Sequence, residues 1–431
     1  MNPITKTITI IFLIVCVCKT SFATILNDIH INGSLSQTYL KSFDNTIWFN
    51  KSTDGSLQMN QASLNAHKSF NNHFRAGIQV ISRDFGPEGN HELDIDWGYL
   101  DYNLNLNLGL RLGRVRVPFG FHNESRDVDL ERTSILLSQS IYPESWRSFM
   151  QSVDGISVYG TFDQFHNAGS FDYQLFYGRA SIPDTFQFIN ILRSNYKTEN
   201  ISINNKDSYG LQLIWEPTIN GLRFAYSGIE SKNKVDMTLT GVLPAPFNTL
   251  NHTTESPFQI ETIDHIYGVE YQYSRFLFTS EYRVFRYRSP INYQAYQSFL
   301  KGQLQSTYTT EQAAQLSSIL TQSLSQAIGN NLAGSASGHQ KGIYFKTEYF
   351  STKWSASLSY DHFINDYEKK DLWTEYTKGF TYSFRYNFTS WLCGKLEYSD
   401  FKGTGVINSV PGALPQAPNW NLFLARLSLS F

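Results

Sequence analysis

The sequence has few of the features that mark soluble disulfide-bonded or helical membrane proteins. It contains only three cysteines, and two of them, Cys16 and Cys18, lie in a segment that we expect to be removed, so no disulfide is expected within the mature chain. Neither sign of charge dominates, since 35 basic residues face 37 acidic ones, which argues against a nucleic-acid binder. After residue 23, no apolar run approaches the roughly 20 residues of a transmembrane helix.

Aromatic residues are what the chain has in abundance. With 8 Trp, 26 Tyr and 32 Phe they make up 15% of the sequence, yet the mean hydropathy is −0.32. A chain that is rich in rings but polar on average must alternate its polar and apolar residues. The length of 431 residues allows one large domain or two to three ordinary ones.

Residues 1–23 have the pattern of a secretory signal peptide. Lys6 gives the positive start, residues 8–17 form the apolar centre, and residues 21–23 (Ser-Phe-Ala) fit the small-x-small cleavage site. A membrane-anchoring helix is the alternative, but the apolar run is short for a span. A lipoprotein is a second alternative, although neither cysteine follows the small residue that lipid attachment needs. We therefore expect residues 24–431 to be exported, either as a soluble protein or as a β-barrel.

Apolar and polar residues alternate along most of the mature chain. Residues 93–99 place Leu93, Ile95, Trp97 and Tyr99 on one face, and residues 104–112 repeat the pattern with leucines. This period of two is typical of β-strands with one apolar face. We predict sixteen strands, most of them near the roughly 10 residues that cross a bilayer when tilted: 28–40, 57–68, 73–83, 92–103, 104–117, 153–162, 170–178, 207–216, 221–230, 262–273, 276–287, 340–350, 353–361, 379–388, 391–401 and 419–431.

The links between these strands alternate between short and long. Short links include 274–275 and 351–352, whereas long ones include 118–152, 231–261 and 288–339. The alternation indicates an all-β, up-and-down antiparallel transmembrane barrel with tight turns on one side and long loops on the other. A secreted β-sandwich is the alternative, but it rarely needs sixteen strands this aromatic. A β-propeller would show a repeat of about 40–50 residues, and we find none.

The last predicted strand ends on an aromatic residue in mid-pattern. Its apolar face carries Phe423, Ala425, Leu427, Leu429 and Phe431. We expect this face to contact lipid, with Phe431 in the periplasmic aromatic girdle of the barrel.

These features resemble the porins of Gram-negative outer membranes. The resemblance rests on the signal segment, the ladder of short and long links, the terminal Phe431, and the segment 112–145, where a Gly-Arg strand end and a Pro-x-Gly bend lead into a long loop. It implies an outer-membrane location among lipid and lipopolysaccharide, and a homotrimer. It also implies that Phe431 is an assembly signal for the barrel-assembly machinery.

A barrel of sixteen strands is wide enough for an aqueous channel, so something must narrow it. Our candidate is the loop 118–152, folded inside the barrel, with these constriction residues: Glu124, Arg126, Asp127, Asp129, Glu131 and Arg132. Basic residues on the polar strand faces form the candidate pore wall: Arg75, Arg111, Arg223, Arg283, Arg385, Lys395 and Arg426. Loop acids facing wall arginines across a narrow gap would create a transverse field that selects solutes by charge. Alternatively, the wall arginines form ion pairs with Glu270, Glu281, Glu348 or Glu397.

The sequence predicts neither a metal site nor a cofactor. Residues 127–131 hint at alternating calcium ligands, but Arg132 stands where the calcium loop needs Gly and Ser138 where it needs Glu. The ten histidines are scattered. Cys393 is interpreted as a lumen-facing or packed thiol.

One helix is predicted outside the barrel wall, at residues 310–328 in the long loop 288–339. Thr309 and Gln312 fit a capping box, and Gly329 fits the C-terminal stop. Its apolar stripe needs a partner, which we expect to be the barrel mouth or a neighbouring subunit.

The function that fits these expectations is passive diffusion of small hydrophilic solutes through a porin, without enzymatic activity. A channel specific for a sugar or for an anion such as phosphate is the main alternative. An outer-membrane lipid hydrolase and a surface adhesin or phage receptor are further alternatives. Energised import is disfavoured, because the first strand begins too close to the cleavage site to leave room for a plug domain.

Overall fold

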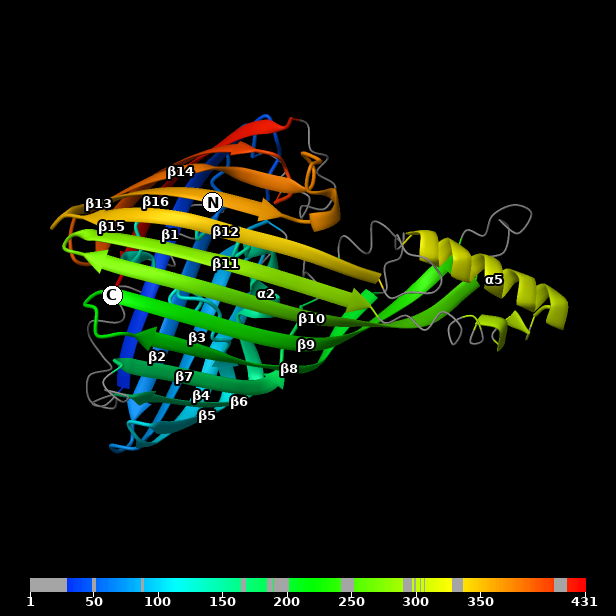
Figure 1. The fold of residues 1–431 in the computed structure, drawn as a ribbon, viewed down its shortest axis with the longest axis horizontal. Coiled ribbons are helices and arrows are strands. Elements are labelled where there is room, and N and C mark those ends of the chain that lie inside the picture. Colours follow the sequence, from blue (N-terminus) through cyan, green and yellow to red (C-terminus); the bar gives the residue numbers. More distant parts are fainter. Residues whose placement is uncertain are drawn as a thin grey trace, which may run out of the picture.

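The computed structural model describes residues 29–48, 52–86, 89–163, 168–183, 189, 201–241, 252–289, 297, 300–302, 304–305, 307–327, 336–406 and 417–431. The described residues form a closed antiparallel barrel of sixteen strands, in which each strand pairs with its neighbours in sequence and β1 pairs with β16 (Figure 1). The strands are β1 (Ile29–Phe43), β2 (Asn60–Ser69), β3 (Phe74–Asp84), β4 (Leu93–Asn105), β5 (Leu108–Arg116), β6 (Ser152–Phe162), β7 (Ser170–Arg179), β8 (Ile201–Glu216), β9 (Leu222–Gly241), β10 (His252–Tyr273), β11 (Phe276–Ser289), β12 (Ala336–Phe350), β13 (Trp354–Ile364), β14 (Tyr376–Asn387), β15 (Leu392–Lys402) and β16 (Asn419–Ser430). The predicted fold class and strand number are confirmed.

Alternation along each strand separates an apolar outer face from a polar inner one, which we call the lumen face. On β15, Leu396 and Tyr398 point outward and are 51% and 42% exposed, whereas Lys395 and Glu397 point inward and are 2% and 3% exposed. Cys393 is buried on the same inner face. The period of two therefore arises because one face of the wall is apolar and the other carries hydrogen-bonding groups.

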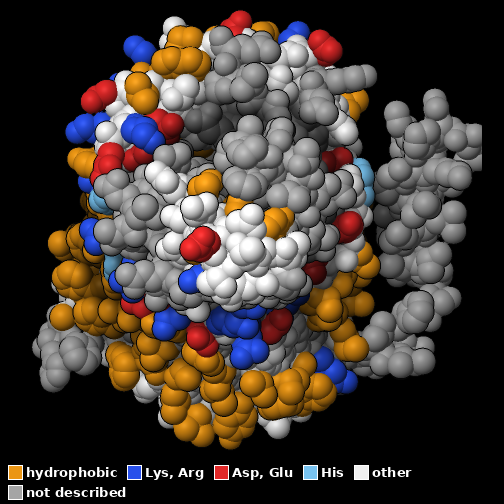
Figure 2. All heavy atoms as spheres, turned by 90° about the vertical axis from the view of Figure 1, so that its right-hand side faces the viewer, with side chains coloured by type: hydrophobic (Ala, Val, Ile, Leu, Met, Phe, Trp, Pro, Cys, Tyr) orange, Lys and Arg blue, Asp and Glu red, His pale blue; other side chains and the backbone are white. Residues whose placement is uncertain are grey.

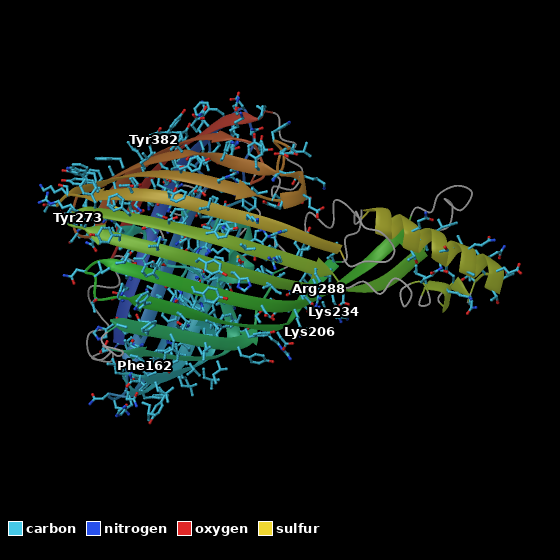
Figure 3. The ribbon with its side chains drawn as sticks, viewed as in Figure 1. Phe162, Lys206, Lys234, Tyr273, Arg288 and Tyr382 are labelled. Carbon is cyan, nitrogen blue, oxygen red and sulfur yellow. The ribbon has the colours of Figure 1, made fainter. Side chains whose placement is uncertain are left out.

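The two ends of the barrel differ as the link lengths predict. We call them the short-turn end, where β2 meets β3 and β10 meets β11, and the long-loop end. Phe162 and Tyr273 lie at the short-turn end, and Lys206, Lys234 and Arg288 lie at the long-loop end (Figure 3). Seen from the long-loop end, charged side chains ring the rim and hydrophobic ones cover the flank (Figure 2).

The hairpin of β9 and β10 is longer than predicted and extends beyond its neighbours in Figure 1. The expected link 231–261 is wrong, since β9 continues to Gly241 and β10 begins at His252, with Thr240 opposite Thr253. The start of β8 joins this extension, because Ile203 pairs with Val235. Strands that leave the apolar belt no longer need an apolar face, so the period of two that marks the other strands fades here.

A β-bulge in β4 overturns one sequence interpretation. The pairing with β3 shifts between Gln79 and Val80, so that Asp96 is an extra residue in β4. Beyond it Trp97 and Tyr99 leave the outward face of Leu93 and Ile95, and Tyr99 lies on the face of the buried Asp101. A single inserted residue moves every later side chain to the opposite face.

The predicted helix is confirmed as α5 (Thr310–Ala327). Its capping box is present, because Thr309 N donates to Gln312 Oε1 at 3.2 Å and Gln312 N donates to Thr309 Oγ1 at 3.4 Å. Leu316 packs with Ala313 and Leu304. Figure 1 places α5 beyond the barrel, at the tip of the extension and not across the mouth. Among the described helices, none has the length and apolarity to cross a membrane. The signal segment 1–23 lies outside the described residues.

Candidate functional site

The connection between β5 and β6, residues 117–151, lies inside the barrel and contacts the wall on several sides. The Gly120 N–H donates to Ser227 Oγ of β9 (3.1 Å), and Thr133 Oγ1 donates to Ser355 Oγ of β13 (2.9 Å). The Ile135 N–H donates to Glu397 Oε2 of β15 (2.7 Å). We call this segment the lumen loop.

Apolar packing and one asparagine fix the base of the lumen loop. Asn123 Nδ2 donates to the carbonyl oxygens of Val117 and Met150, at 2.9 and 3.2 Å, and so joins the two ends of the loop. A buried cluster covers this junction: Val115, Val117, Phe119, Leu137, Ile141, Tyr142, Met150, Val153, Phe176, Ala180, Ile266 and Tyr344. Gly120 adopts φ +57°, and a Cβ there would collide with the Tyr142 hydroxyl and with Glu281, so the close approach requires glycine.

Buried ion pairs hold the lumen loop against β4. Arg147 Nη2 donates to Asp96 Oδ1 of β4 at 2.7 Å and to Asp127 Oδ2 of the loop at 2.6 Å. Arg116 Nη2 also binds Asp96, at 3.0 Å. Burial by itself raises the pKa of Asp127, but Arg147 and Arg116 lower that pKa well below the usual range. Asp127 and Arg147 therefore stay charged, and their ion pairs fix this part of the lumen loop against β4.

A second set of ion pairs joins the lumen loop to β3. Glu144 accepts from Arg126 Nη2 and from Arg83 Nη1 of β3, each at 3.0 Å. Although burial alone raises the pKa of Glu144, Arg126 and Arg83 lower the pKa to about 2. Because all three side chains are buried, loss of Glu144 would remove the carboxylate that both arginines share.

Asp129 anchors the opposite side of the lumen loop to β15 and β16. Its carboxylate accepts from Arg426 Nη1 at 3.0 Å and from Ser428 Oγ at 2.7 Å. Arg132 Nη2 and Lys395 Nζ lie 3.0 and 3.5 Å from the same carboxylate. Burial raises the pKa of Asp129, but Arg426 and Lys395 outweigh it and lower that pKa far below its ordinary value. We call this group the Asp129 anchor.

A carboxylate on β11 receives three loop and wall donors. The hydroxyl of Tyr142 donates to Glu281 at 2.7 Å, the hydroxyl of Tyr344 at 2.8 Å, and the Phe121 N–H at 2.8 Å. Glu281 thus binds hydroxyl and amide groups and no arginine of the predicted wall.

The predicted constriction residues divide into two groups. Arg126, Asp127 and Asp129 are buried in the contacts above, and Arg132 is partly buried at 16% side-chain exposure. Glu124 and Glu131 are exposed. The predicted gap between loop acids and wall arginines does not exist for Asp127 and Asp129, because both touch their cations directly. The two aspartates also have separate partners, so they do not converge on one metal position. In the described ranges, no group of three His, Cys, Asp or Glu side chains has the arrangement of a metal site.

The predicted wall residues each have a partner. Arg223 pairs with Glu270 at 2.5 Å. Glu270 is one of the four glutamates that the alternative interpretation named as ion-pair partners of the wall arginines. Arg283 binds Asp264 at 2.7 Å, Arg385 donates to the Leu130 carbonyl oxygen, and Arg75 binds Asp101 at 2.7 Å. Sequence reasoning missed Arg83, Asp96 and Asp264, whose polar-face positions were their only signal. It also missed Asp101, which the regular alternation puts on the apolar face and which only the bulge at Asp96 turns inward.

A pocket remains beside the lumen loop, on the wall of β12 to β16. Polar side chains that include Ser359, Asp361 and Thr381 line one part of it, and Trp48 and Trp420 line another. The aromatic part belongs to a buried apolar cluster at the long-loop end, which contains Leu40, Ile47, Trp48, Met59, Phe85, Ile135, Trp420, Leu422 and Leu424. The lumen is thus polar in its middle and partly apolar toward the long loops.

No protein-family model matches the chain. An uncharacterized protein of Aquifex aeolicus is 35% identical over 80 residues, which are 18% of this chain and only 17% of that protein. Among solved structures, Salmonella typhi OmpF in complex with daunomycin superposes with a TM-score of 0.55 at 9% identity, covering 94% of this chain and 97% of that one. An anion-selective porin from Comamonas acidovorans gives 0.53 at 12% identity, over 94% and 99%. The trimer form of Vibrio cholerae OmpT gives 0.50 at 12% identity, again over 94% and 99%.

At such identities the likeness shows the fold alone. The chain has the fold of an outer-membrane β-barrel. Within that class it is a porin-like barrel, with sixteen closed strands and a loop folded into the lumen.

Proposed function

We propose that the chain forms a water-filled outer-membrane channel through which small hydrophilic solutes diffuse passively. The observation that carries this proposal is the division of the wall, with an apolar outer face for lipid and a lumen face of charged, hydroxyl and amide groups. The closed sheet pairs the backbone groups within the wall, and the polar side chains face the lumen rather than the lipid. Water and solutes can therefore cross the membrane without unpaired polar groups of the wall being exposed to hydrocarbon. The lumen loop then narrows the path.

Planar-bilayer recording tests the proposal. Detergent-refolded protein should insert in discrete conductance steps of reproducible size. If the protein shows the heat-modifiable gel mobility of a folded barrel but gives no conductance steps, the channel proposal is overturned. A lipid-hydrolysis assay on the same preparation addresses the enzyme alternative, since the proposal assigns no catalytic step to the chain and expects no turnover.

The proposed setting follows the same fold. Residues 1–23 would direct export of a Gram-negative outer-membrane protein, and the barrel would sit among lipid and lipopolysaccharide as a homotrimer. Phe431 would be read by the barrel-assembly machinery. Cross-linking in the native membrane should give three-subunit species, and Phe431→Ala should lower the assembled fraction, whereas Phe423→Ala should not. Monomer alone, or equal assembly of both variants, would contradict these assignments.

A role in surface binding is a second candidate, because the β9–β10 extension and α5 project beyond the barrel (Figure 1). Deletion of residues 290–335 should leave conductance intact and abolish adhesion or phage attachment if this candidate is correct. Unchanged attachment would exclude it.

A further inference from the structure

Two arginines at the short-turn end of the lumen share one buried carboxylate. Arg75 of β3 donates from Nε and Nη2 to Asp101 Oδ2 of β4, at 2.8 and 2.7 Å. Arg111 of β5 places Nε 3.5 Å from the same oxygen. Tyr159 of β6 donates its hydroxyl to the other oxygen of Asp101 at 2.6 Å. Two positive charges thus face one negative charge.

The cations of this group face the water, and the carboxylate does not. The side chain of Arg75 is 52% exposed and that of Arg111 is 18% exposed, whereas that of Asp101 is 1% exposed. The group lies on the lumen face, because Arg75 shares the face of Arg83, which touches the lumen loop. A passing solute therefore meets guanidinium groups first.

Aromatic rings hold Arg111 in place without using its hydrogen bonds. Its guanidinium lies 5.2 Å from the ring centre of Tyr99 and 4.2 Å from that of Tyr159. The Nε of Arg111 is buried and has no hydrogen-bond partner in the described structure, so a solute can reach only the terminal nitrogens of this guanidinium. A stacked guanidinium keeps its donor edge free for another acceptor.

No carboxylate of these three strands offsets the excess charge. The other acids of β3, β4 and β5 are Asp84, Asp94 and Asp96, and all of them lie at the long-loop end. The wall at β9 and β10 differs, since Arg223 of β9 has Glu270 at 2.5 Å and a second, exposed glutamate, Glu216, at 3.8 Å.

We propose that Arg75 and Arg111, held by Asp101, form a subsite that favours small anions on the short-turn side of the lumen loop. This inference rests on the proposed channel function and names residues that set its ion preference. The anion is recognised as an acceptor by guanidinium donors, and chloride is the probe. In water, a full charge about 7 Å from the path changes the local concentration of a monovalent ion about threefold.

Reversal potentials in a KCl gradient test the subsite. Arg75→Gln should lower the permeability ratio of chloride to potassium about ninefold, because the local chloride concentration falls about threefold and the local potassium concentration rises about threefold. Asp101→Asn should raise that ratio, because it removes the only carboxylate of the group and keeps both arginines. Arg75→Lys should leave the ratio near that of the unaltered protein.

Arg288→Gln is the matched control, because Arg288 also binds a carboxylate twice, Glu261 at 2.8 and 2.5 Å, but at the long-loop end of β11. If Arg75→Gln matches Arg288→Gln, or if Asp101→Asn does not raise the ratio, the subsite is overturned while the conductance steps still support the channel. Absence of all conductance would instead remove the channel proposal itself. The opposite shifts expected from the two lumen variants keep the test decisive if one of them fails to insert.

Discussion

The Asp129 anchor offers the sharpest test of how the lumen loop is held. The change is Asp129→Asn, which keeps the size of the side chain and its acceptor for Ser428 but removes the charge. Arg426 and Lys395, which are 5% and 2% exposed, would then remain buried without their carboxylate. The neighbouring Glu131→Gln is the control, since Glu131 is exposed and lies in the same short helix, η1 (Asp129–Glu131).

Removing one partner of a buried ion pair costs about 3–5 kcal/mol. Every 1.4 kcal/mol is about a tenfold change in an equilibrium, so the anchored position of this part of the loop should lose at least about a hundredfold in population relative to the detached one. The pairs around Arg147 and Glu144 remain, so the detachment should be local. The barrel itself should still close, because the sixteen-strand ladder does not depend on Asp129.

Trypsin and single-channel recording measure the detachment. Arg126 and Arg132 lie on either side of Asp129 and are shielded in the anchored loop. Folded Asp129→Asn barrels should be cut at Arg132, since Arg126 keeps its pair with Glu144, and should show larger current noise, whereas Glu131→Gln barrels should show neither change. Equal protection and equal noise in the two variants would refute the assignment of Asp129 as an anchor.

Two further predictions concern the same loop. A Cβ on Gly342 of β12 would collide with the Ser140 carbonyl oxygen, so Gly342→Ala should displace this part of the loop and expose it to protease. The control is Gly394→Ala, whose Cβ would meet only the Phe388 ring at 3.0 Å. Equal protease resistance of the two variants would contradict the packing of Ser140 on Gly342. Acid should also loosen the loop, because the pKa of Glu144 falls from 4.5 to about 2 on folding, so its contribution to anchoring is complete above about pH 5 and is lost as the pH falls toward 2. Current noise that is equal at pH 6 and pH 3 would contradict this contribution.

The number of strands and their two faces could be predicted because the alternation repeats sixteen times and the lipid-facing side is so aromatic. The bulge at Asp96 could not, because one extra residue leaves a run such as Leu93 to Tyr99 looking regular. The ends of β9 and β10 were missed for a related reason: strands outside the apolar belt carry polar residues on both faces.

The lumen loop could be located from its length and its Pro-x-Gly bend, but its partners could not. Asp129 binds Arg426, almost 300 positions later in the chain, and Ile135 binds Glu397. No local pattern encodes such pairs. Charge composition alone also made Asp127 and Asp129 look equivalent to Glu124 and Glu131, whereas the first two are buried and the last two are exposed. Reversing all four charges would therefore mix selectivity with loop collapse, so a selectivity test should use Glu124 and Glu131 only.

The seam between β1 and β16 has a consequence for how the chain reaches its final shape. Two backbone hydrogen bonds of 3.0 Å join Gly33 and Phe431, because the N–H of each donates to the carbonyl oxygen of the other. A Cβ on Gly33 would collide with the Phe431 ring. Gly33 and Phe431 are 398 positions apart in the chain, so no local folding event brings them together. Until they meet, the sheet has two open edges with unpaired backbone groups, and it is a template for joining other strands. The pairing of β1 with β16 is thus the step after which the sheet has no open edge.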